Sequence, residues 1–123
     1  MFVLSLLSAL LVPGVLPADA VKPVEVLLVP EYSEGIVFDH DGNAYISHGK
    51  IITQIRRDGK SRKWAETGAP NGHKILADGT HLVCDASRHA VLHLDADGKM
   101  LEPAAKECDG KPLRGPNDLT LDP

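Results

Sequence analysis

The sequence predicts an all-β fold made of repeated antiparallel sheets, and three observations support that class. Four Asp-Gly pairs lie between short runs of strand-forming residues, which is a strong signal for β-hairpins. The segments around these pairs recur along the chain in the same order. No segment after residue 20 shows sustained helical periodicity. These observations favour a chain of stacked hairpins over a mixed α/β fold.

The repeat becomes visible when segments of the chain are aligned. Residues 34–47 align with residues 71–84, and residues 55–60 align with residues 94–99, so that Asp-Gly pairs and the apolar positions coincide. A third copy begins at Asn117. The copies therefore start at residues 34, 71 and 117, which are 37 and 46 residues apart. These intervals bracket the ~40–45 residues of one four-stranded blade in a β-propeller.

The repeat predicts two successive four-stranded sheets. After the first strands, which open at residues 34 and 71, the expected strands are 44–47, 50–56 and 61–66, and then 81–84, 89–94 and 100–102. The expected turns are Asp41-Gly42, Asp58-Gly59, Asp78-Gly79 and Asp97-Gly98. A generic meander or sandwich also has many short strands, but a repeat in register across both hairpins favours a propeller. Two blades cannot close a ring, so we expect the chain to be part of a longer protein.

The composition is that of a soluble globular protein. The chain has 123 residues, a formal charge of −4 and 43% hydrophobic residues, which excludes a disordered acidic tail and a membrane bundle. Basic and acidic residues are interspersed, and only Trp64, two Tyr and two Phe could stack on bases. We therefore expect no nucleic-acid partner. The six histidines show no zinc-ligand spacing, and no Gly-x-Ser-x-Gly motif indicates a serine hydrolase.

The first twenty residues are typical of a signal peptide. Residues 2–12 are almost wholly apolar, and Ala18-Asp19-Ala20 has the small-x-small pattern of a cleavage site. The apolar run is shorter than the roughly 20 residues that span a bilayer. A buried first strand and a membrane anchor are the alternatives. We expect residues 1–20 to be removed and the protein to be exported, periplasmic or secreted, without stable membrane association. In that compartment a buried thiol at Cys84 is favoured over a bridge to Cys108.

The candidate site consists of the polar residues that open the first strand of each copy, namely Glu34, Asn71 and Asn117. First strands line the central channel of a propeller, so these side chains are expected to converge near its axis. One carboxylate and two amide oxygens suit a hard cation such as calcium or magnesium. Each residue alone is also a common turn former, but three polar residues at equivalent positions favour a shared site.

These motifs resemble those of the SMP-30/gluconolactonase/LRE-like family over residues 25–123. The resemblance is carried by Ser33-Glu34-Gly35, by Pro70-Asn71-Gly72 and, most distinctively, by Arg114-Gly115-Pro116-Asn117-Asp118-Leu119. Members of that family are six-bladed β-propellers that hydrolyse sugar lactones at a divalent metal ion. The resemblance thus implies that residues 21–123 form the N-terminal part of such a propeller, about two blades and the first strand of a third.

The resemblance also assigns roles to individual residues. It implies that Glu34 and Asn117 are metal ligands and that Asn71 contacts the substrate or metal-bound water. Calcium is the expected ion, with magnesium, manganese and zinc as alternatives. The family's general base is an Asp from a later blade, expected beyond Pro123, so no catalytic residue is expected here. Ala69 stands where some members carry an Arg, which leaves the choice of lactone open.

Two other classes of function remain compatible with the sequence. One is a non-enzymatic propeller that binds calcium or another ligand, and the other is a related propeller enzyme with different chemistry. Fold alone does not separate them. Arg88 and His89 could face the mouth of the site, as could Asp85, but an ordinary solvated loop is the favoured interpretation. The expected partner is a small-molecule lactone substrate, and the oligomeric state is left open.

Overall fold

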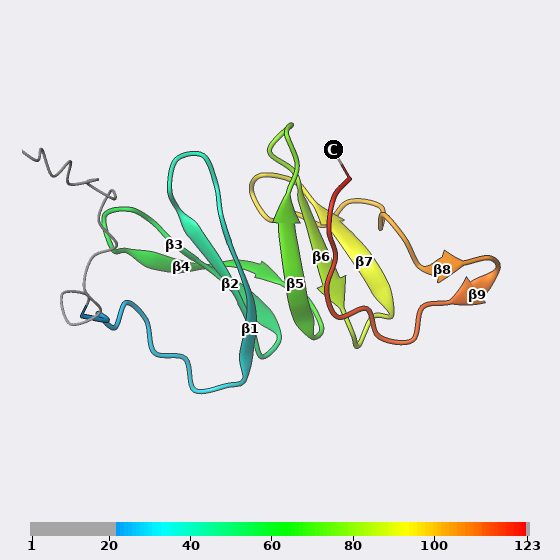
Figure 1. Ribbon diagram of the computed structural model, residues 1–123, viewed down its shortest axis with the longest axis horizontal. Helices are drawn as coiled ribbons and strands as arrows, with labels where there is room; N and C mark the ends of the chain where they lie inside the picture. Colours follow the sequence, from blue (N-terminus) through cyan, green and yellow to red (C-terminus); the bar gives the residue numbers. More distant parts are fainter. Residues whose placement is uncertain (1–21, 123) are drawn as a thin grey trace, which may run out of the picture.

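The computed structural model describes residues 22–122, and in this range the chain is all-β (Figure 1). The strands are β1 (Ser33–Phe38), β2 (Ala44–His48), β3 (Ile51–Ile55), β4 (Ser61–Glu66), β5 (Pro70–Ile75), β6 (His81–Asp85), β7 (Ala90–Leu94), β8 (Glu107–Cys108) and β9 (Lys111–Pro112). They form sheets in the orders β1-β2-β3-β4, β5-β6-β7 and β8-β9. Within residues 22–122 there is no helix that could cross a membrane. The predicted signal peptide, residues 1–20, lies outside the described residues.

The first sheet has the four antiparallel strands that the repeat predicts. Its register pairs Val37 with Tyr45 and Tyr45 with Gln54, so that consecutive strands are joined by tight turns. The register shifts between Glu34 and Ile36, where Gly35 has a φ of 57°. Such a bulge re-aims the side chains on either side of it. The start of β1 is therefore irregular at the residue that the sequence analysis selects.

The four Asp-Gly pairs at residues 41–42, 58–59, 78–79 and 97–98 occupy equivalent turns, as the sequence predicts. In each turn the glycine N–H donates to the carbonyl oxygen three residues earlier, as from Gly42 to Asp39 over 3.1 Å and from Gly98 to Asp95 over 3.0 Å. The four glycines have φ values of 79°, 79°, 82° and 86°. Glycine adopts this left-handed conformation without a steric penalty. A type I turn followed by a left-handed residue is the common three-residue hairpin loop.

The second sheet differs from the prediction because its fourth strand is not regular. Residues 100–102 form only part of an irregular segment, in which isolated bridges join Leu94 to Met100 and Val91 to Ala105. The two bridges are three residues apart on β7 but five residues apart on the partner segment, so the two backbones cannot stay in register. Pro103 also lacks an N–H for a ladder. The expectation of a regular strand at 100–102 is therefore wrong.

The beginning of the third copy is also not a regular strand. Residues 117–122 carry no strand assignment, and the segment is joined to β5 by a backbone hydrogen bond from Gly72 N to Asn117 O of 2.8 Å. Instead, the chain forms a short hairpin of β8 and β9 before it reaches Asn117. The first strand expected for the third copy is therefore present only as an extended segment beside β5 (Figure 1).

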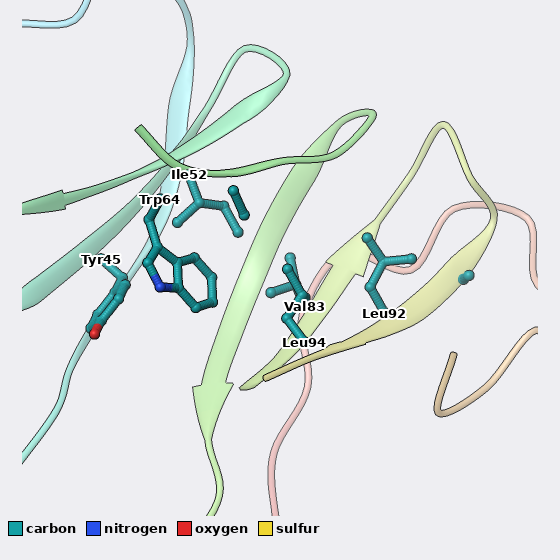
Figure 2. Packing of buried hydrophobic residues seen from close by; sticks show 8 residues of the cluster. Tyr45, Ile52, Trp64, Val83, Leu92 and Leu94 are labelled. Carbon is teal, nitrogen blue, oxygen red and sulfur yellow. The ribbon is translucent and has the colours of Figure 1, made fainter. Parts of the chain in front are cut away.

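The hydrophobic core lies between the first two sheets. Figure 2 shows side chains of both sheets in this core, namely Tyr45, Ile52, Trp64, Val83, Leu92 and Leu94. Full burial of one such side chain contributes about 1.5–3 kcal/mol. Trp64 Nε1 also donates to the carbonyl oxygen of Ala96 over 3.1 Å, which ties β4 to the turn after β7. This packing places β1 beside β5 (Figure 1).

Candidate functional site

Glu34 and Asn71 meet at the start of β1 and β5. Asn71 Nδ2 donates a hydrogen bond of 3.0 Å to Glu34 Oε2, although the two residues are 37 positions apart in the sequence. Glu34 is exposed and Asn71 is half-buried. The structure therefore brings two of the three candidate residues into direct contact at the same end of the two sheets.

A glycine follows each of these two residues, because the backbone of the next copy passes against it. A Cβ on Gly35 would collide with the carbonyl oxygen of Asn71. A Cβ on Gly72 would lie 2.9 Å from the carbonyl oxygen of Asn117 and 2.6 Å from Cα of Asp118. Real Cβ atoms do not approach other atoms so closely. At both steps a glycine of one copy thus lies against the backbone carbonyl of the residue that opens the next copy.

Asn117 lies next to this pair through its backbone. Its carbonyl oxygen accepts from Gly72 N, which is the peptide group directly after Asn71. Its side chain is exposed and makes no hydrogen bond to any residue within 22–122. Asn117 is therefore adjacent to Asn71 along the edge of β5, and its amide oxygen remains available for a ligand.

Tyr32 completes the cluster, and sequence reasoning did not select it. Its hydroxyl group donates to Glu34 Oε2. This hydrogen bond to the carboxylate, together with the negative charge of Glu34, raises the pKa of Tyr32 above its ordinary value. The sequence does hold a signal for this contact, because residues i and i+2 of an extended chain face the same side. Tyr32 therefore stays protonated and holds one oxygen of Glu34.

The remaining oxygen of Glu34 fits a hard cation. Both hydrogen bonds to the carboxylate end on Oε2, and no described residue donates to Oε1. A pocket of about 300 Å³ lies beside it, lined by Ser33, Glu34, Gly35, Ile36 and Ile46. Within the described range no group of three or more His, Cys, Asp or Glu side chains could hold a metal. A cation at Glu34 would thus also require amide or carbonyl oxygens from other residues.

Asn71 is oriented differently from a second ligand of the same ion. Its NH2 group, not its oxygen, points at Glu34. Because the two ends of a planar amide diverge, Oδ1 is directed away from the Glu34 carboxylate. This geometry suits a contact from Asn71 to a substrate or to water.

The loop after β6 is held by Asp85, which is fully buried. Its carboxylate accepts hydrogen bonds from three backbone N–H groups, those of Gly68 at 2.6 Å, Ala69 at 3.0 Å and Arg88 at 2.9 Å. Burial alone would raise the pKa of Asp85, but these bonds outweigh it and hold the pKa below its ordinary value. Asp85 is therefore a buried structural clamp at the end of β6, and the expectation that it lies in a solvated loop is wrong.

His89 belongs to the same loop and has an unusual backbone conformation. Its φ is 52°, which is uncommon for a residue other than glycine. Its Nδ1 lies 3.0 Å from the carbonyl oxygen of Arg114, in the segment that leads to Asn117. This contact ties the β6–β7 turn to the approach of the third copy.

Two buried histidines were not selected by sequence reasoning. His73 of β5 and His81 of β6 are each 2% exposed, and His73 Nε2 lies 2.8 Å from His81 Nδ1. The rings of Tyr45 and Trp64 pack against both. Burial lowers the pKa of His73 to about 3 and that of His81 to about 4. The sequence signal was weak, because histidine is found as often outside as inside a fold.

The fold and the cluster define an all-β protein in which repeated antiparallel sheets bring polar residues together at one end. No model of a known protein family matches the chain, and no curated protein aligns with it significantly.

Proposed function

We propose that the chain forms the first two blades and the beginning of a third in a six-bladed β-propeller, and that the complete ring hydrolyses a sugar-type lactone with a divalent metal ion. The observation that carries this proposal is the repeated contact from Gly35 to Asn71 and from Gly72 to Asn117. A packing step that repeats between blades gathers the openings of the first strands near one axis. The resemblance of these motifs to the lactonase family supports the reaction.

The face of β1 that points away from the core is apolar, which favours a ring that continues on that side. Val37 packs against the core, whereas its neighbours Ile36 and Phe38 face the other way and are 59% and 62% exposed. Exposed apolar side chains in a row on a strand indicate a surface that another element covers. In the proposed ring this element is a further blade, related to the first as the first is to the second.

Four residues of the cluster have separate roles in the proposed reaction. Glu34 and Asn117 would hold the cation through Oε1 and the amide oxygen. When bound, the cation would polarise the lactone carbonyl. Tyr32 keeps the Glu34 carboxylate in position. Asn71, whose NH2 group is used by Glu34, would accept a hydrogen bond at Oδ1 from a substrate hydroxyl or from the attacking water. The proton of that water would pass to an Asp from a later blade, beyond Pro123.

A calcium- or ligand-binding propeller without catalytic activity is the second candidate. The observation that favours it is that Glu34 is the only acid bonded into this cluster by the described residues. Such a cluster can bind a cation without supplying a base. The two candidates differ in turnover, not in cation binding.

The test is Glu34→Gln in the full-length protein, because it removes one negative charge with little change of shape. We expect calcium affinity, measured by calorimetric titration, and lactone hydrolysis to fall together. Glu107→Gln is the matched control, since Glu107 is an exposed acid on β8, and it should change neither. Unchanged calcium affinity in Glu34→Gln would rule out Glu34 as a ligand. If the wild-type protein binds calcium but hydrolyses no lactone, the result would support the non-enzymatic binding propeller instead of the lactonase.

A further inference from the structure

A second cavity lies at the opposite end of the strands from Glu34. Glu34 is at the start of β1, whereas this cavity begins at Asp39, directly after the end of β1, and has a volume of about 390 Å³. Both sheets contribute to its walls, with Tyr45, Gln54 and Arg62 on one side and Ile75 and His81 on the other. It is therefore formed by the packing of the first sheet on the second.

A directed chain of hydrogen bonds fixes one wall of the cavity. Arg62 Nε donates to Gln54 Oε1 over 2.7 Å, and Gln54 Nε2 donates to the hydroxyl of Tyr45 over 2.7 Å. The Tyr45 hydroxyl donates to Asp39 Oδ2 over 3.1 Å, and Asn43 Nδ2 donates to the same oxygen over 2.8 Å. Tyr45 is 4% exposed and Gln54 is 8% exposed. The wall is thus polar and rigid before any ligand arrives.

Asp39 is the last acceptor in this series of hydrogen bonds, and its side chain is a carboxylate. Burial would raise its pKa, but the hydrogen bonds from Asn43 and Tyr45 outweigh burial and hold the pKa below its ordinary value. Its two oxygens already accept from Asn43 and Tyr45. Asp39 therefore orients the wall, and ligand recognition is left to the groups with free hydrogen-bonding capacity.

His81 supplies one such group. The ring of its neighbour His73 has a buried Nδ1 with no partner in the described structure. A buried lone pair is tolerated better than a buried N–H without an acceptor. The proton of neutral His73 is therefore on Nε2 and is donated to His81 Nδ1. It follows that the proton of neutral His81 is on Nε2, so that His81 offers an N–H donor that is not used by His73.

The other free groups carry both signs of charge. The guanidinium of Arg62 uses Nε for Gln54 and forms no ion pair with a described residue. Asp41 and Asp97 come from two different turns at the rim, and neither forms an ion pair within residues 22–122. A ligand with a net negative charge would meet these carboxylates, and a cation would meet Arg62. A hydroxyl group both donates and accepts, so it matches all of these groups at once.

We propose that this cavity binds a neutral cyclic polyol of monosaccharide size. Its volume falls within the about 300–1,000 Å³ that small-molecule sites occupy. The hydroxyl groups would accept from Arg62 and from His81 Nε2, and they would donate to Asp41 and Asp97. Ile75 provides the apolar surface against which the carbon atoms of the ring pack. The proposal does not depend on lactone hydrolysis, because it uses none of the residues around Glu34.

The test is a titration of the full-length protein with D-glucose, followed by backbone amide NMR. We expect saturable shifts at Gly79, which lines this cavity, and none at Gly35, which lines the pocket beside Glu34. Arg62→Met keeps the apolar stem and removes the donors, and it should weaken binding about tenfold, as for one charge-assisted hydrogen bond. Arg56→Met, at an exposed turn position, is the control and should bind like the wild type.

Several outcomes would overturn the proposal. These are shifts at Gly35 without shifts at Gly79, equal weakening by both arginine variants, and no saturable binding of glucose. Tighter binding of acetate, methylammonium or glycine than of glucose would show that charge, and not hydroxyl groups, is recognised. Should Arg62→Met fail to fold, Asp97→Ala provides the second variant, because Asp97 is exposed; wild-type affinity in that variant would also count against the site.

Discussion

Asn71 donates its side-chain amide hydrogen to the carboxylate of Glu34 over 3.0 Å, and so joins the openings of two sheets that are 37 residues apart in the chain. The hydrogen bond links two residues with different proposed roles. Glu34 would hold a cation, and Asn71 would orient a substrate or water. Variants of the two residues should therefore have different effects.

Asn71→Ala should lower lactone turnover more than it lowers calcium affinity. Loss of the amide removes the proposed contact to substrate, but the oxygen Oε1 of Glu34 remains. We expect kcat/KM to fall about tenfold or more, as for the loss of a hydrogen bond to a charged or reacting group, with little change in the calcium Kd. Lys60→Ala, at an exposed position between β3 and β4, is the control. A parallel loss of calcium affinity in Asn71→Ala would instead make Asn71 a ligand.

Gly35→Ala should destabilise the protein more than Gly59→Ala does. Both glycines have positive φ, 57° and 79°, so both variants carry the penalty of about 1–2 kcal/mol for a left-handed residue. A Cβ on Gly59 meets nothing within 4 Å, whereas one on Gly35 collides with Asn71 O. Urea unfolding of the full-length protein measures the difference, which we expect to exceed about 1 kcal/mol. Equal effects would show that the backbone of Asn71 moves away freely.

The protein should lose stability as the pH falls below about 6.5, because His73 and His81 are buried as neutral rings. Their folded pKa values, about 3 and about 4, lie below the ordinary value, so the unfolded chain binds more protons in this window. The stabilisation from each neutral ring is complete above the histidine pKa of the unfolded chain. It is lost as the pH falls towards the lower histidine pKa of the folded protein. At pH 5 the loss should be roughly 2 kcal/mol for each ring.

Thermal unfolding between pH 7.5 and pH 4.5 tests this dependence. Asp39 opposes the lowering of the pKa at His81, and Lys74 adds to the lowering at His73, so the two rings need not contribute equally. His81→Phe should flatten the profile relative to the wild type. An identical slope in wild type and His81→Phe would contradict the assignment.

Asp85→Asn should destabilise the loop after β6 strongly. The substitution keeps the shape, but its NH2 group replaces one acceptor oxygen, so that it faces either the N–H of Gly68 or those of Ala69 and Arg88. We expect a loss of about 2–4 kcal/mol in the free energy of unfolding. Asp78→Asn is the matched control, since Asp78 is exposed and bonds only to Thr80, and it should cost less than about 1 kcal/mol. A small effect at Asp85 would mean that the loop rearranges.

Local chemistry alone was sufficient to predict the strands of the first sheet and the four hairpin turns. The Asp-Gly turns depend on φ preferences of residues that are adjacent in the chain. The fourth strand of the second sheet was predicted wrongly, because its pairing depends on how residues 100–105 accommodate Pro103 against β7. An alignment of the repeat copies does not reveal that two paired segments contain unequal numbers of residues.

Local periodicity and comparison of the copies were sufficient for the all-β class, the turn positions and the choice of Glu34, Asn71 and Asn117 as equivalent polar residues. Three contacts became known from the folded structure alone: Asn71 meets Glu34 through its NH2 group, Tyr32 joins them, and His73 and His81 share a buried contact. These contacts depend on the angle and register at which one sheet packs on the next. That geometry is set by the summed packing of the core between the sheets, and no single segment encodes it.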